Sequence, residues 1–113
     1  MKKPKVIQLD IFTDEWKFLL LYSTPEKGKI VAKELFPDTD YKFESRGATF
    51  CKFNKVPLIW INSEQAKGKQ KLLTAIHEGL HLVETIGNWV GIKDEEWRAE
   101  TLEYVVRMIM KNI

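Results

Sequence analysis

Residues 74–83 read TAIHEGLHLV, and this stretch decides what fold and what chemistry we expect of the chain. His77 and His81 stand four residues apart within a long helical pattern, so their side chains lie on one face, one turn apart. Two imidazole rings can then converge on one ion, and zinc suits imidazole nitrogen without needing redox chemistry. We therefore predict a zinc site held by His77 and His81.

Glu78 follows His77 directly and is rotated by about 100° around the helix axis, so it flanks the metal without having to bind it. There it can take a proton from a zinc-bound water, whose pKa the metal lowers to roughly 7. This is the chemistry of the H-E-x-x-H motif. A histidine pair that only packs or decorates a helix is the alternative. The chain has two histidines, however, and both fall in the motif.

Gly79 supports the metal site indirectly. A glycine inside a helix costs about 1 kcal/mol relative to alanine, so its presence suggests that another element approaches closely. We interpret Gly79 as a contact point for another element of the fold.

A catalytic zinc usually keeps three protein ligands and one open position. Glu96 and Glu100 stand four residues apart in the last helical pattern, where like charges repel and a cation would relieve them. We predict Glu96 as the third ligand, helped by the small Ala99, with Glu100 as the alternative. Cys51 is a further candidate, although a lone thiol beside a hairpin is typical of a buried inert cysteine. Glu84 shares the histidine face and is interpreted as a solvated residue or as one that supports the ligands without binding the metal.

The second half of the chain is predicted to be helical. A helix from about residue 64 to 85 is expected, with Asn62 as its N-cap and Gly87 as its C-cap. A last helix is expected to follow Asp94, its cap, and to continue to about Lys111. The apolar stripes that should face the core are Leu72, Leu73, Ile76, Leu80 and Val83 in the first helix, and Leu102, Val105, Val106 and Ile109 in the second.

The first half is predicted to consist mainly of strands. Residues 6–12 form one strand, and residues 48–53 and 57–61 form a hairpin through residues 54–56. Residues 16–22 fit a buried strand or part of a helix, residues 23–28 are turn-rich, and residues 29–40 are ambiguous. The expected fold class is α+β: a small, mostly antiparallel sheet packed against the H-E-x-x-H helix, with a C-terminal helix. The strand Leu58–Ile61 is expected at the sheet edge.

Composition limits the classes of protein that need be considered. The chain has 113 residues, 44% hydrophobic and 30% charged, which suits one globular domain spanning residues 1–113. The net charge is +2 and the basic residues are spread out, so we expect no nucleic-acid partner. The single cysteine suggests a reducing compartment. We see no apolar run long enough to span a bilayer and no signal peptide, so we expect a cytoplasmic protein without a membrane partner.

The segment Thr74–His81, followed by Glu96 to Ala99, resembles a minimal zincin. It is similar to the ImmA/IrrE-type metallopeptidases and to short zincin-like proteins of phages and prophages, in which a glutamate near the start of the next helix, in an E-x-x-A pattern, follows the H-E-x-x-H helix. The resemblance covers about residues 46–113. It departs in the shorter loop after His81 and in Glu100, where the family has asparagine. Glu84 and Gly87 exclude the metzincin pattern, which needs glycine and histidine there.

The resemblance implies a zinc-dependent peptidase with a mixed fold, acting on a peptide or protein substrate, with Glu78 as the base. Three functions remain open. The chain is a metallopeptidase, a metal-binding regulatory or interaction protein without turnover, or a nucleic-acid-associated protease of the SprT-like kind. The sequence does not define the substrate or the oligomeric state.

Overall fold

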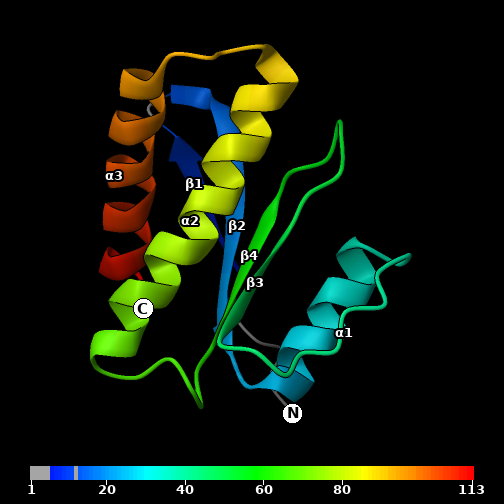
Figure 1. The fold of residues 1–113 in the computed structure, drawn as a ribbon. Helices are drawn as coiled ribbons and strands as arrows, with labels where there is room; N and C mark the ends of the chain where they lie inside the picture. Colours follow the sequence, from blue (N-terminus) through cyan, green and yellow to red (C-terminus); the bar gives the residue numbers. More distant parts are fainter. Residues whose placement is uncertain (1–5, 12) are drawn as a thin grey trace.

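The computed structural model describes residues 6–11 and 13–113, which form a mixed four-stranded sheet with helices on both faces (Figure 1). The strands are β1 (Val6–Ile11), β2 (Thr13–Ser23), β3 (Gly47–Phe50) and β4 (Leu58–Asn62), in the order β1-β2-β4-β3. The outer pairs β1–β2 and β3–β4 are antiparallel, and the central pair β2–β4 is parallel. The predicted α+β class and C-terminal helix are confirmed, whereas the sheet, predicted to be mostly antiparallel, is mixed with a parallel central pair. Phe12, expected to end the first strand, lies outside the described residues.

The helices are α1 (Pro25–Leu35), α2 (Lys69–Val90) and α3 (Glu95–Lys111). α1 arises from the segment that was predicted to be turn-rich and then ambiguous. Its N-terminus is set by Thr24, whose side chain accepts a hydrogen bond from the Lys27 amide, and by Pro25 at its first position. Residues 16–22, ambiguous by pattern, belong to β2. None of these three helices is long and apolar enough to cross a membrane.

β4 lies in the middle of the sheet, so the prediction that Leu58–Ile61 forms the edge is wrong. It pairs with β2 on one side and with β3 on the other, and all five of its residues are buried. A continuous apolar strand is typical of a sheet covered on both faces, which explains why LIWIN occupies the centre. The edge beside α2 is formed by β3.

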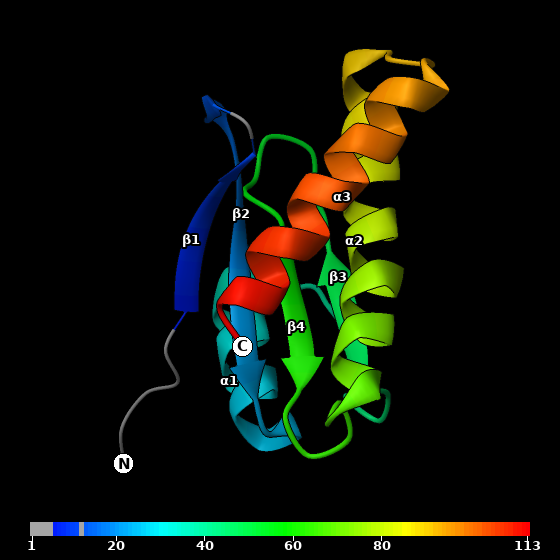
Figure 2. The same ribbon diagram turned by 90° about the vertical axis from the view of Figure 1, so that its left-hand side faces the viewer.

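Helices cover both faces of the sheet (Figure 2), and each face carries its own core. Side chains alternate between the faces, so neighbouring residues such as Leu20 and Leu21 belong to different cores. α2 and α3 cover one face, and α1 with the loop after it covers the other. The first core includes Phe18, Leu20, Ile59, Ile61, Leu82, Val83, Val105 and Ile109. The second includes Leu21, Val31, Phe36, Phe43, Phe50, Leu58 and Trp60.

The buried face of α2 differs from the predicted one. Four of the five residues expected in the core have exposed fractions of 40–50%, namely Leu72, Leu73, Ile76 and Leu80, whereas Val83 is buried as expected. The face that packs is instead Thr74, Ala75, Glu78, Gly79, Leu82, Val83, Ile86 and Gly87. Small residues at Ala75 and Gly79 admit close neighbours, which a search for large apolar side chains overlooks. The predicted stripe of α3 is confirmed, with Val105 and Ile109 buried and Leu102 and Val106 packed against them.

The ends of α2 also lie later than predicted. The side chain of Asn62 caps a turn rather than the helix, because its Oδ1 accepts a hydrogen bond from the Glu64 amide at 2.9 Å and α2 begins at Lys69. Gly87 lies inside α2, and the C-cap is Gly91 in the left-handed conformation, with φ of 75°. The predicted cap of α3 is confirmed, since the Asp94 side chain accepts a hydrogen bond from the Glu96 amide.

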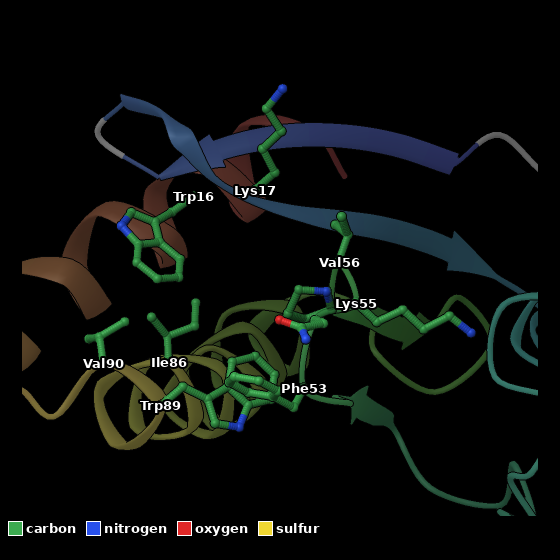
Figure 3. A pocket seen from close by; sticks show the side chains of 10 residues that line it. Trp16, Lys17, Phe53, Lys55, Val56, Ile86, Trp89 and Val90 are labelled. Carbon is green, nitrogen blue, oxygen red and sulfur yellow. The ribbon is translucent and has the colours of Figure 1, made fainter.

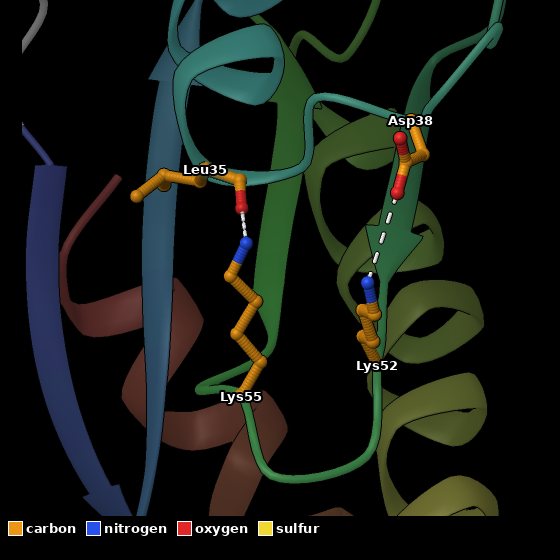
Figure 4. A network of polar contacts seen from close by, with 4 residues as sticks. All are labelled: Leu35, Asp38, Lys52 and Lys55. Atoms are coloured by element: carbon orange, nitrogen blue, oxygen red, sulfur yellow. Dashed lines mark hydrogen bonds and ion pairs between the residues drawn. The ribbon is translucent and has the colours of Figure 1, made fainter.

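The loop between β3 and β4 is tied to the end of α1 (Figure 4). Lys55 donates its Nζ to the carbonyl oxygen of Leu35, the last residue of α1. Lys52 forms an exposed ion pair with Asp38, with 3.7 Å between Nζ and Oδ2. An exposed pair contributes little to stability, so we assign these contacts the role of orienting the loop.

Candidate metal centre

His77 and His81 lie together on the exposed side of α2. Their Nε2 atoms are 3.2 Å apart, and the ring centroids are 4.8 Å apart in an edge-to-face arrangement. Two nitrogens that each bind zinc at 2.0–2.1 Å in a tetrahedral arrangement stand roughly 3.3 Å apart, so this spacing fits a shared ion. The same distance fits a hydrogen bond between two neutral imidazoles. The geometry therefore agrees with the predicted pair of ligands without requiring a metal.

Glu78 is turned away from the solvent and toward the sheet. Its exposed fraction is 5%, and its Oε1 lies 2.8 Å from the hydroxyl of Thr49 in β3. The Thr49 hydroxyl is also 3.0 Å from the Glu78 carbonyl oxygen, but its single proton serves one acceptor at a time. A buried carboxylate is costly unless it is paired, so its presence on the packing face of α2 favours a functional role over a structural one.

Two hollows meet at Glu78. One, of about 520 Å³, lies between β3 and the histidine side of α2; its lining includes Tyr41, Thr49, Cys51, His81 and Thr85. The other, of about 200 Å³, is lined by Ser45, Arg46, Gly47, Thr74, His77 and Glu78. Gly47, His77 and Glu78 line both. We call the larger hollow the cleft and the smaller one the side lobe.

Gly47 determines how closely β3 approaches α2. A Cβ atom at this position would lie 2.8 Å from Cγ2 of Thr74, 2.9 Å from the carbonyl oxygen of Trp60 and 3.2 Å from Cγ of Glu78. The first two distances are shorter than normal contacts allow, and the carbonyl of the central strand cannot easily yield. The absence of a side chain at residue 47 therefore lets the strand lie directly against the motif.

The structure does not bring Glu96 or Glu100 to the histidine pair. α3 turns Arg98, Leu102 and Val105 toward α2, where Arg98 contacts Gly87 and the other two contact Gly79. Glu96 and Glu100 are each two residues from Arg98 and so lie about 200° around α3, on its exposed side. Among the side chains that the structure describes, those of residues 6–11 and 16–113, no three from histidine, cysteine, aspartate or glutamate gather in a way that could hold a metal.

The expected role of Ala99 as the close contact is also not seen, because Ala99 is exposed. The predicted close approach at Gly79 is confirmed: a Cβ there would lie 3.2 Å from Cδ1 of Leu102. The small residues that allow the two helices to pack closely belong to α2 and not to α3.

Cys51 lies at the rim of the cleft as a partly buried thiol. Burial raises its pKa above the ordinary value, and a hydrogen bond with Thr85 lowers it by a smaller amount. The raised pKa favours the protonated thiol at neutral pH, which agrees with the interpretation of an inert cysteine. Glu84 is exposed, as predicted.

A third hollow, of about 460 Å³, lies on the other side of the loop between β3 and β4 (Figure 3). It is surrounded by Trp16 from β2, Phe53 from the loop, and Ile86, Trp89 and Val90 from the end of α2. The rings of Phe53 and Trp89 meet edge to face, with centroids 6.0 Å apart. We call this hollow the aromatic pocket. None of the lining residues that the structure describes is a histidine, cysteine, aspartate or glutamate.

Four residues at the site were not identified from the sequence. Thr49 contacts Glu78, Gly47 admits β3, and Arg46 and Thr74 line the side lobe. Arg46 precedes β3 and Gly47 and Thr49 belong to it, and no spacing in the sequence relates these three to residues 77–81. Thr74 lies on α2 three residues before His77 and four before Glu78, so helix spacing was the signal that could have identified it.

Comparison with known proteins adds no relative: no family model, no curated protein and no solved structure matches this chain.

Proposed function

We propose that this chain is a metal-dependent peptidase in which His77 and His81 hold a zinc ion and Glu78 acts as the general base. The observation that carries the proposal is the convergence of the two Nε2 atoms to 3.2 Å, with the buried carboxylate of Glu78 one residue away and facing the cleft. When bound, zinc would polarise a substrate carbonyl and supply a water of lowered pKa.

Residues of the chain itself would carry the other steps of the reaction. Glu78 would accept the proton of the attacking water and deliver it to the leaving amine. Thr49, 2.8 Å from Oε1, would hold the Glu78 carboxylate in one orientation, so that its other oxygen is directed at the reacting group. The close packing at Gly47 would keep strand and helix in this relation.

β3 would position the substrate. Its inner side pairs with β4, and the Arg46 carbonyl accepts a hydrogen bond from the Asn62 amide. Because hydrogen-bonding groups alternate along a strand, those of Gly47 and Thr49 face outward, away from the sheet. The Gly47 carbonyl already accepts from the Ser45 hydroxyl at 2.7 Å. An extended peptide would therefore pair chiefly at Thr49, beside Glu78.

The decisive experiment replaces Glu78 with glutamine and measures bound zinc and cleavage of a fluorogenic peptide library in parallel. We expect Glu78→Gln to keep its zinc and to lose roughly 10²–10⁴-fold in kcat/KM, the usual contribution of a general base. Glu84→Gln is the matched control, since Glu84 is an exposed carboxylate on the same helix. Equal cleavage by Glu78→Gln and wild type would disprove the assignment of the base.

The rival function is a metal-binding regulatory or interaction protein without turnover. It is favoured by one observation: the side chains that the structure describes assemble two metal ligands and not three. Zinc binding that depends on both histidines, together with no cleavage of any library member, would support this rival and exclude the peptidase.

A further inference from the structure

The side lobe differs from the cleft in carrying a cation next to the motif. Its lining includes the guanidinium-bearing Arg46 and the hydroxyl-bearing residues Ser45 and Thr74, beside His77 and Glu78. Among the side chains that the structure describes, Arg46 makes no ion pair. An arginine without a partner beside a candidate hydrolytic site is suited to bind an anionic group of a ligand.

The backbone that carries Arg46 is held in place by Asn62 at the end of β4. The Asn62 amide donates to the carbonyl oxygen of Arg46 at 2.8 Å, and its side-chain Nδ2 donates to that of Ser45 at 3.0 Å. Asn62 is fully buried, so the donor side of both bonds is shielded from water, while the side chain of Arg46 is exposed. The position of Arg46 at the side lobe is thus built into the sheet and is not an accident of a loose loop.

The lobe also contains a buried polar atom that lacks a partner. Thr74 has an exposed fraction of 2%, and its hydroxyl makes no hydrogen bond to any group in the described part of the chain. Leaving a buried hydroxyl unpaired destabilises the fold. A polar occupant of the lobe that reached this hydroxyl would relieve the cost, whereas an apolar occupant would not.

We propose that the side lobe binds a carboxylate of the substrate through Arg46, so that the peptidase prefers peptides with a carboxylate just after the scissile bond. This inference rests on the proposed function. The position of the carboxylate after the scissile bond follows from the course of β3. A peptide that pairs antiparallel to β3 would have its C-terminal end near Arg46, the residue before the strand. Both a C-terminal carboxylate and an aspartate side chain supply this chemistry.

The test measures binding separately from cleavage. N-terminally labelled tetrapeptides are titrated against the full chain treated with a chelator, and fluorescence anisotropy reports the Kd. Three peptides of one sequence are compared: the free acid, its amide, and an amide with aspartate as the last residue. Arg46→Gln is the variant, and Lys93→Gln, which removes an exposed cation elsewhere, is the control.

We expect the two carboxylate peptides to bind wild type and Lys93→Gln about tenfold more tightly than the plain amide, and Arg46→Gln to lose this preference. Tight binding of the free acid alone would assign the lobe to the C-terminal carboxylate, and of the aspartate peptide alone to an acidic side chain. The inference would be overturned if the free acid and the amide bound equally well, if none of the three peptides bound, or if the preference survived in Arg46→Gln. A preference without cleavage after zinc is restored would leave the binding of a carboxylate by Arg46 standing and would refute the peptidase.

Discussion

The cleft and the aromatic pocket are lined by the same helix but have opposite chemistry. The cleft takes His77, Glu78 and His81 from the middle of α2, whereas the aromatic pocket takes Ile86 and Trp89 from its end. The strand β3 and the loop after it separate the two, with Thr49 against Glu78 and Phe53 against Trp89.

This difference shows where the helix contributes stability and where it contributes chemistry. Burying aromatic surface stabilises the fold, whereas burying the Glu78 carboxylate costs stability. We therefore expect substitutions in the cleft to alter metal binding and catalysis with little loss of stability. Substitutions in the aromatic pocket should lower stability and leave metal binding and catalysis nearly unchanged.

The largest effect is expected from the histidines. His77→Ala and His81→Ala should each weaken zinc binding by roughly 100-fold or more, because loss of a direct ligand should cost at least as much as loss of an outer contact. Competition with a chromogenic chelator measures the affinity. Glu96→Ala and Glu100→Ala should leave it unchanged, since both side chains lie on the exposed side of α3. A large loss in either glutamate variant would mean that α3 turns when metal binds.

The next effect is expected in the aromatic pocket. Trp89→Ala should lower the free energy of unfolding by about 1–3 kcal/mol, less than a fully buried tryptophan, because it removes the contact with Phe53 and part of the core. Chemical denaturation measures this change, and zinc affinity should stay at the wild-type value. A matching fall in zinc affinity would show that the two hollows are coupled through the loop.

The smallest effect is expected at Thr49, on the strand that separates the cleft from the aromatic pocket. Thr49→Val keeps the shape of the side chain and removes its hydrogen bond to Glu78. It should change the free energy of unfolding by only about 0.5–1.5 kcal/mol and lower kcat several-fold, because Glu78 loses the contact that orients it. Steady-state kinetics on the best library peptide measures the kcat. Thr85→Val, a second threonine that lines the cleft, should leave kcat unchanged.

Local signals in the chain predicted much of the fold. The α+β class, the hairpin of β3 and β4, the cap at Asp94 and the buried stripe of α3 depend on neighbours in sequence, and each is confirmed. The central position of β4 and the buried face of α2 could not be predicted in this way. Both depend on which elements cover which surface, and an apolar stripe looks the same whether it faces a core or water.

The same division holds for the candidate site. The sequence alone determined the pairing of His77 and His81 and the position of Glu78 beside them, because helix geometry relates residues one and four apart. The tertiary structure decided what surrounds them: it placed Thr49 and Gly47 against Glu78, Arg46 in the side lobe, and Glu96 on the far side of α3. These relations join residues far apart in the chain, and they follow from the packing of strand on helix and of helix on helix.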